Sequence, residues 1–186
     1  MRTPQGTTLG IVLLMLGAGI SESWMGRQLW GTNGEAGLWS GDIWSNHNSQ
    51  FLADPYSFTH ITHGILLYAF LSLVLKRALL PARLLFAVGL ESIWEIIENT
   101  NTVIDRYRMA TISLNYYGDS IVNSMGDILA CIVGFVLASR LPRGLTLAGT
   151  IALEIILLIW TRDNLTLNVI MLVHPTRALT LWQLGK

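Results

Sequence analysis

The chain has 186 residues, of which 52% are hydrophobic and only 13% are charged. Ordinary soluble domains carry about 25% charged residues, so the composition predicts one integral membrane domain covering residues 1–186. Twelve basic and twelve acidic side chains cancel, which leaves no cationic field to attract nucleic acid. The single cysteine, Cys131, excludes an intrachain disulfide and a multi-cysteine metal site.

Five stretches are long and apolar enough to cross a bilayer, which takes roughly 20 residues. We therefore predict an all-α, polytopic membrane bundle of about five transmembrane helices, at residues 8–25, 58–75, 82–99, 119–139 and 144–161. The first stretch imitates a signal peptide, but no clear cleavage site follows it, so we interpret it as a retained helix. The apolar run 165–173 is too short to span and is expected to be interfacial or to pack against the bundle.

Basic residues predict how the bundle is oriented. The turn between the second and third helices is flanked by Lys76, Arg77 and Arg83, and the turn between the fourth and fifth by Arg140 and Arg143. Neither turn contains an acidic residue. Because positive charge favours the inner side, these turns are expected in the cytoplasm, together with the amino terminus.

Two loops are then expected on the outer side of the membrane. Residues 26–57 hold Trp30, Trp39 and Trp44, and tryptophan prefers the headgroup region. We expect this extracytoplasmic loop to fold as a cap over the outer end of the bundle. Residues 100–118 form the second extracytoplasmic loop and include a β-prone run at 111–117 that would form a surface flap.

Three consecutive predicted helices each carry a polar stripe at helical spacing. The stripes are His60 and His63 on the second helix, Glu91, Glu95 and Glu98 on the third, and Asp119, Asn123 and Asp127 on the fourth. Residues three or four apart share a helix face, and all three stripes fall in the outer half of the predicted topology. We expect them to meet in one pocket. Gly64 and Gly126 would allow close helix approach nearby.

Carboxylates inside a membrane are costly and by default mark function. Crowded carboxylates in a low dielectric cannot all stay ionised without compensation, which suits acid/base chemistry. The candidate catalytic residues are Glu91, Glu95, Glu98, Asp119, Asn123 and Asp127. Alternatively a divalent metal ion acts as cofactor and supplies the missing positive charge. Its candidate ligands are His60, His63, Glu95 and Asp127.

The structural alternative is that these groups pair with one another and with Arg106 or Arg108 to fix helix packing. Other titratable side chains carry less weight. We expect Glu154 to join the site or to find a lone partner, Glu22 to be interfacial, His47 to lie in the loop and His174 to be at the surface.

Three segments carry a family resemblance: residues 58–64 (FTHITHG), 91–99 (ESIWEIIEN) and 117–124 (YGDSIVNS). They resemble a bacterial inner-membrane family known as domain of unknown function 2585, over about residues 39–141. The order of His, Trp-Glu-x-x-Glu and Asp is also similar, more loosely, to VanZ-like membrane proteins. These resemblances imply a location in the cell envelope and the inner membrane, and no particular reaction.

The sequence leaves three hypotheses open. The first is an enzyme, metal-assisted or acid/base, that acts on a lipid-linked or envelope substrate. The second is a proton- or cation-coupled transporter, although the inner halves of the helices are almost uninterruptedly apolar apart from Glu154. The third is a structural or assembly protein. Membrane lipid is the expected partner in each case, and no protein partner is predicted.

Overall fold

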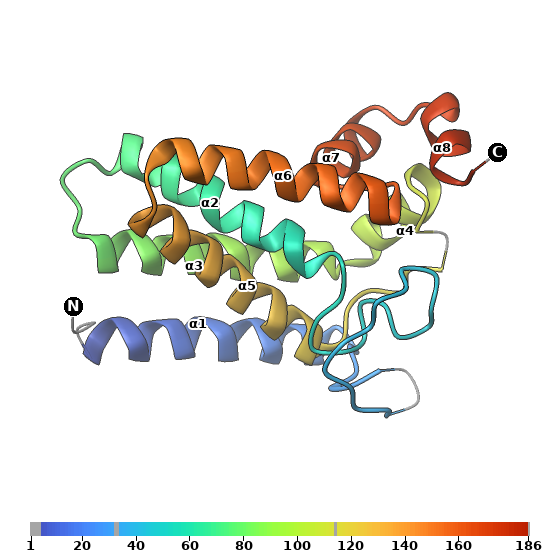
Figure 1. Ribbon diagram of the computed structural model, residues 1–186. Helices are drawn as coiled ribbons and strands as arrows, with labels where there is room; N and C mark the ends of the chain where they lie inside the picture. Colours follow the sequence, from blue (N-terminus) through green and yellow to red (C-terminus); the bar gives the residue numbers. More distant parts are fainter. Residues whose placement is uncertain (1–4, 32–33, 114, 186) are drawn as a thin grey trace.

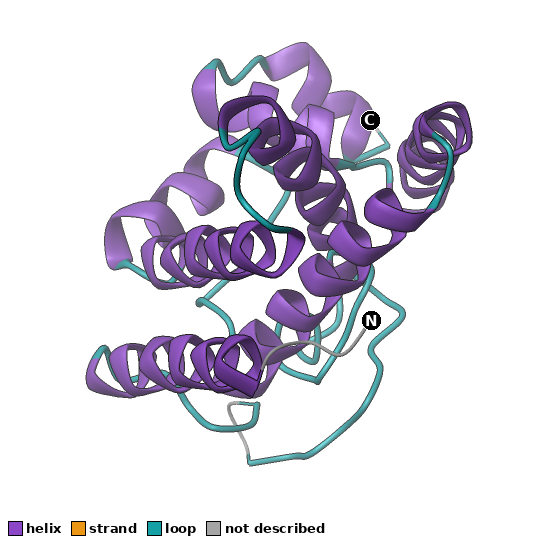
Figure 2. Cartoon of the chain, turned by 90° about the vertical axis from the view of Figure 1, so that its left-hand side faces the viewer, coloured by secondary structure: helices purple, strands orange, loops and turns teal. Residues whose placement is uncertain are grey.

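The computed structural model describes residues 5–31, 34–113 and 115–185. These residues form eight helices and no strand (Figure 2). The helices are α1 (Gln5–Trp24), α2 (Ser57–Val74), α3 (Leu80–Glu98), α4 (Asn101–Ala110), α5 (Ile121–Arg140), α6 (Arg143–Thr161), α7 (Leu165–Val173) and α8 (Arg177–Gln183). The predicted all-α membrane bundle is confirmed, and each of the five long helices lies within a few residues of its expected position.

Four of the long helices, α1, α2, α5 and α6, are apolar enough by length and composition to cross a membrane. The remaining long helix, α3, has 19 residues but carries Arg83 and three glutamates, so its composition is more polar than that of the other four. It packs against α1, α2 and α5, and Glu91 and Glu95 are buried among them. The bundle thus shields the polar face of α3, as a charged face at membrane depth requires.

The long helices run alternately in opposite directions, so the bundle has two distinct ends (Figure 1). The amino-terminal end of α1 and the α2–α3 and α5–α6 turns lie at one end. The loop from α1 to α2, with α4, α7 and α8, lies at the other, which we call the cap end. Prolines begin two helices at the turn end, Pro81 in the first turn of α3 and Pro142 directly before α6, where a missing N–H costs nothing.

Helices α2 and α5 form the most extensive helix–helix contact of the described chain. Glycine residues on both helices allow their backbones to come close together. A Cβ built at Gly64 would lie 1.9 Å from the Cys131 carbonyl oxygen, and one at Gly134 would lie 1.9 Å from the Ile61 carbonyl oxygen. The role expected for Gly64 is confirmed. Gly126 instead faces the loop backbone, since its Cβ would lie 1.8 Å from the Leu52 carbonyl oxygen. Cys131 is fully buried at this contact.

The loop from α1 to α2 is folded onto the bundle by backbone hydrogen bonds. The first N–H groups of α5, at Ile121 and Val122, donate to the Gln28 and Leu29 carbonyls. At its other end the buried Asp54 carboxylate accepts from the backbone N–H groups of Ser49 and Tyr56, both at 2.7 Å. Unpaired N–H groups at helix starts need such partners, so the loop closes the cap end.

The second loop differs from its prediction, because residues 100–118 contain helix α4. The Thr100 side chain caps it by accepting from the Val103 N–H, and Ile104, Tyr107 and Ala110 form its buried face. These buried residues are spaced three apart, and residues three apart lie on the same face of a helix. After the helix, the described residues of the β-prone run 111–117 form no strand.

Candidate functional site

The two histidines lie on the cap-end half of α2, directed into the bundle. His60 is buried and the His63 side chain is 19% exposed, with ring centroids 4.8 Å apart. Asp54 fixes the start of the helix by accepting from the Ser57 N–H at 3.3 Å. The Trp94 ring of α3 lies edge-on to His63 at 6.3 Å. The imidazoles are thus held side by side, one turn apart, as their spacing predicted.

A single carboxylate of α3 joins both imidazoles. The Nδ1 atoms of His60 and His63 lie 2.6 and 3.0 Å from Oε1 of Glu91. The next carboxylate along the helix, Glu95, has its Oε1 3.3 Å from His60 Nδ1. Oε1 of Glu91 is therefore within hydrogen-bond distance of both imidazoles. The Glu95 carboxylate lies near Nδ1 of His60 as well.

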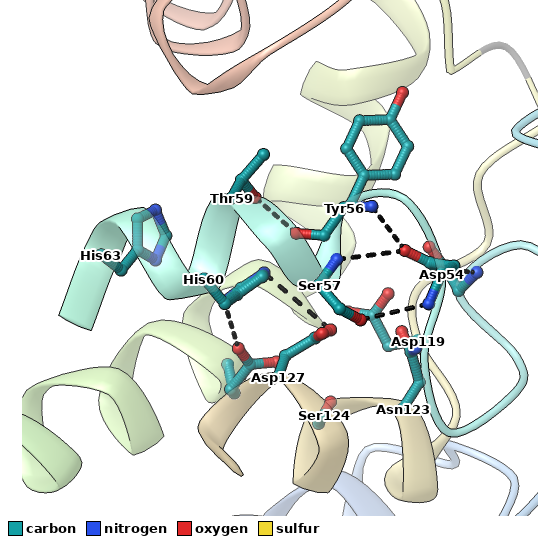
Figure 3. A network of polar contacts seen from close by, with 12 residues as sticks. Asp54, Tyr56, Ser57, Thr59, His60, His63, Asp119, Asn123, Ser124 and Asp127 are labelled. Carbon is teal, nitrogen blue, oxygen red and sulfur yellow. Dashed lines mark hydrogen bonds and ion pairs between the residues drawn. The ribbon is translucent and has the colours of Figure 1, made fainter. Parts of the chain in front are cut away.

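The third helix of the site, α5, approaches His60 from the opposite side of its ring. Oδ2 of Asp127 lies 3.9 Å from His60 Nε2. Figure 3 shows His60 directed at Asp127, with Asn123 and Asp119 farther along toward the loop. Three consecutive long helices thus meet at His60, and the expected convergence of the stripes is present at this level of the bundle.

The buried carboxylates have few partners. Glu95 is completely buried and Asp127 is 4% exposed, yet both oxygens of Glu95 and Oδ1 of Asp127 have no hydrogen-bond partner. Within the described ranges, no Lys or Arg side chain lies within 4.0 Å of either residue. A buried ionised carboxylate without a partner is strongly unfavourable, so the cluster calls for added positive charge or added protons.

The donor atoms are suited to a metal ion. Two groups bring their ligand atoms within 4.8 Å of one another: His60, His63 and Glu91, and His60, Glu95 and Glu98. Imidazole nitrogen with carboxylate oxygen suits first-row divalent metals. Asp127 belongs to neither group and lies beyond His60, while Glu91, one of the candidate catalytic residues, is the group that contacts both imidazoles.

The polar residues nearer the loop form a separate network. Asp119 precedes α5, whose cap is Ser120, so its expected place within that helix is wrong. Its Oδ2 accepts from the Asn99 amide at 3.0 Å and the Tyr116 hydroxyl at 2.8 Å. Burial raises the pKa of Asp119 to about 6, and the Tyr116 hydrogen bond opposes this rise. Asn123 donates to the Phe51 carbonyl at 2.8 Å and thereby holds the loop.

A cavity of about 880 Å³ connects the two networks. It is lined by the histidines, by Glu91, Glu98, Asp119, Asn123 and Asp127, and by the aromatic side chains Trp94, Tyr107 and Tyr116. The last two were missed by sequence reasoning because they lie in segments expected to be surface loop. Their rings meet edge to face at 5.3 Å. Trp94 and Asn99 belong to the segment 91–99 that carries the family resemblance. Their place in that segment is the sequence feature that could have identified them as site residues.

Of the remaining candidates, Glu154 and His47 have structural partners, whereas both carboxylate oxygens of Glu22 are buried without a hydrogen-bond partner. Glu154 accepts from the backbone N–H groups of Leu165 and Thr166 at 3.3 and 3.1 Å, so it caps α7 and does not line the cavity. Glu22 is fully buried, contrary to the interfacial position expected, because α1 packs its last turns against α3 and α5. His47 stacks on Phe51 within the loop.

The arginines that the structural alternative required lie elsewhere. Arg106 donates to the Leu172 carbonyl at 2.9 and 2.6 Å, and Arg108 donates to the Tyr116 carbonyl at 2.5 Å. Neither forms an ion pair with a carboxylate of the cluster. In this part of the described chain, the imidazoles of His60 and His63 are the basic groups paired with the cluster.

Comparison with known proteins places the chain in a family. Residues 22–185 match the family described as Protein of unknown function (DUF2585). The chain belongs to this DUF2585 family. A UPF0314 protein of Brucella anthropi is 43% identical over 180 residues, covering 95% of this chain and 91% of the relative. One from Rhizobium etli is 49% identical over 166 residues, covering 89% and 85%.

A third relative, a UPF0314 protein of Paracoccus denitrificans, is 47% identical over 160 residues, which is 86% of this chain and 83% of the relative. No solved structure is significantly similar to the chain. The DUF2585 resemblance predicted from the three quoted segments is confirmed, and the match extends beyond residues 39–141 to nearly the whole chain. The looser VanZ likeness stays a prediction.

Proposed function

We propose that this DUF2585 protein is a membrane enzyme whose His/Glu/Asp cluster binds a divalent metal ion and acts on a lipid-linked or envelope substrate. The observation that carries the proposal is the convergence of the His60 and His63 Nδ1 atoms on one oxygen of Glu91. It is supported by the buried oxygens of Glu95 and by Oδ1 of Asp127, which accept no hydrogen bond, because both carboxylates share the one His60 imidazole as their basic neighbour. A bound cation would offset charge that the protein itself leaves uncompensated.

In this proposal His60, His63 and Glu91 hold the metal, and Glu95 and Asp127 supply acid/base groups beside it. A bound divalent ion would polarise an oxygen of the substrate or activate a water. Glu95 lies beside His60 Nδ1 and Asp127 beside Nε2; with Nδ1 bound to the metal, the imidazole would keep its proton on Nε2, which faces Asp127. Tyr116 and Asp119 would position the substrate farther toward the loop.

The proposed location is the bacterial inner membrane, with the cap end outside. The basic residues Lys76, Arg77, Arg140 and Arg143 lie at the turn end, opposite the cavity (Figure 1), and positive charge favours the cytoplasmic side. Labelling of intact cells with a membrane-impermeant maleimide tests this in a Cys131→Ser background. Ser45→Cys in the loop should react and Arg77→Cys should not, and the reverse pattern would invert the proposed orientation.

Metal analysis tests the proposed site directly. Untagged protein purified in detergent should retain about one divalent metal ion per chain, as expected for a single three-ligand site. His63→Ala and Glu91→Gln should lose it, and His174→Ala, which alters an exposed histidine, should keep it. If the wild-type protein binds no divalent metal after dialysis against zinc or manganese, the metal-assisted enzyme gives way to an acid/base or purely structural cluster.

The transporter alternative gains no support from Glu154, its expected relay. That carboxylate is engaged by three hydrogen bonds from Leu165 and Thr166. The structural alternative predicts that substitutions at the cluster reduce stability and cellular function together. Glu95→Gln keeps the shape of a fully buried side chain, so loss of function with unchanged thermal stability would favour the enzyme over the structural protein.

A further inference from the structure

The cavity changes character along the bundle axis. Near the cap end its wall is polar, and deeper in the bundle it is lined by Leu66 and Leu67 of α2 and Leu90 of α3. Leu66 and Leu67 lie three and four residues past His63, and Leu90 lies four residues before Trp94, so the apolar walls continue the helix faces that carry these cavity-lining side chains. The cavity therefore joins a polar chamber to an apolar channel on the same two helices.

The apolar part of the cavity is open at the side of the bundle. Leu66 and Leu90 line it and are nevertheless 53% and 43% exposed, so they form its rim between α2 and α3. The short helix α7 adds Val169, which is 50% exposed, to the apolar lining of the cavity. Exposed leucine on a membrane-crossing helix faces lipid. Leu66 of the membrane-crossing candidate α2 would therefore face the acyl chains, with Leu90 of α3 beside it and the polar chamber behind them.

The polar chamber offers neutral hydrogen-bonding groups around the acidic cluster. Its wall includes the amide side chains of Asn48, Asn115 and Asn168 and the hydroxyl groups of Ser113 and Tyr116. Oδ1 of Asn48 is buried without a hydrogen-bond partner, which a bound hydroxyl group would supply. Among the described residues no Lys or Arg lines this cavity, whereas Glu91, Glu98, Asp119 and Asp127 do, so apart from the proposed metal ion it offers no cationic group to hold a phosphate.

We infer that the cavity admits a membrane lipid with an uncharged, hydroxyl-rich head group, which enters from the bilayer between α2 and α3. The inference rests on the proposed function, since it names the substrate class of that same site. The head group occupies the chamber beside His63, Glu91 and Asn48, and the hydrocarbon chains leave past Leu66 and Leu90. Amides and hydroxyls bind sugar-like hydroxyl groups, and the leucine rim covers the chain that carries them.

Binding of defined lipids to the purified, metal-loaded protein tests this. Monogalactosyl diacylglycerol and phosphatidylglycerol with identical acyl chains are compared by native mass spectrometry or by lipid-dependent thermal shift. We expect the galactolipid to bind at least about tenfold more tightly, a difference of about 1.4 kcal/mol. Equal affinity, or a preference for phosphatidylglycerol, would overturn the assignment of an uncharged head group.

Variants at the rim test the entrance. Leu66→Trp and Leu90→Trp place a larger side chain in the opening and should weaken galactolipid binding by about tenfold or more. Leu73→Trp is the matched control, because Leu73 is 69% exposed on α2 and does not line the cavity. If all three variants bind the galactolipid as the wild-type protein does, the proposed entrance is wrong.

Metal content separates this inference from the proposed function. Both rim variants should retain the divalent metal, since neither alters His60, His63 or Glu91. If the wild-type protein binds no divalent metal but still prefers the galactolipid, the metal site is refuted and the lipid site is retained. If the wild-type protein binds the metal but shows no preference between the two lipids, the lipid site is refuted and the metal site is retained.

Discussion

Replacement of Gly64 by alanine tests the helix contact on which the site depends. The added Cβ would lie 1.9 Å from the Cys131 carbonyl oxygen and 2.7 Å from the Phe135 backbone nitrogen. Ordinary contact begins at 3.4 Å, so α2 and α5 must separate by the difference, about 1.5 Å. Both obstructing atoms belong to the backbone of α5, so no change of side-chain rotamer relieves the clash.

The expected cost follows from two opposing effects. Overpacking of a closely packed contact costs about 1–3 kcal/mol, whereas exchanging glycine for alanine in a helix interior gains about 1 kcal/mol. Because two backbone atoms are too close, we place Gly64→Ala at the upper end of this cost. The net loss in free energy of unfolding should be about 2 kcal/mol.

Thermal unfolding in detergent measures this loss against a matched variant. Gly149 lies in α6, and a Cβ added there would meet no atom within 4 Å, so Gly149→Ala should retain or slightly gain stability. His60 lies one turn before Gly64, so separation of the helices should also draw its Nε2 away from Asp127 of α5. A Gly64→Ala protein that melts no lower than Gly149→Ala would refute the reasoning.

Three further predictions concern single residues. Burial raises the pKa of Asp163, which is 1% exposed, from 3.8 to about 6; its stabilising effect is therefore complete below pH 3.8 and is lost as the pH rises through 6. Relative to Asp163→Asn, the wild-type protein should lose on the order of 3 kcal/mol across this range, measured by unfolding at several pH values, and parallel pH profiles would contradict it. Glu154→Ala should destabilise the start of α7 by about 1 kcal/mol, seen as faster amide exchange at Leu165 and Thr166; unchanged exchange there would remove its capping role. Removal of the metal by a chelator should lower the stability of the wild-type protein by about 3 kcal/mol when the metal had been present at about 100 times its Kd, with no effect on Glu91→Gln; an equal shift in both proteins would place the metal elsewhere.

Local sequence signals were sufficient for the five long helices and for the stripe residues, but not for the short helices α4 and α8. Runs of apolar residues located the five long helices, because the length of an apolar run is a property of neighbouring residues. The positions of Gly64 and Glu91 on helix faces followed from the 3.6-residue period. Side-chain capping was not recognised from the sequence. The helix that Thr100 caps, α4, was missed, and the helix that Ser120 caps, α5, was predicted to begin two residues too early.

The amino-acid sequence by itself determined that this is a helical membrane protein of the DUF2585 family with His, Glu and Asp at one level of the bundle. The tertiary structure alone decided which of these groups meet. Whether His60 faces Glu91, Glu95 or Asp127 depends on how each helix is rotated about its axis, and that rotation is set by distant contacts such as Gly64 against Cys131. The cavity and its Tyr116 wall likewise arise only where segments far apart in the chain pack together.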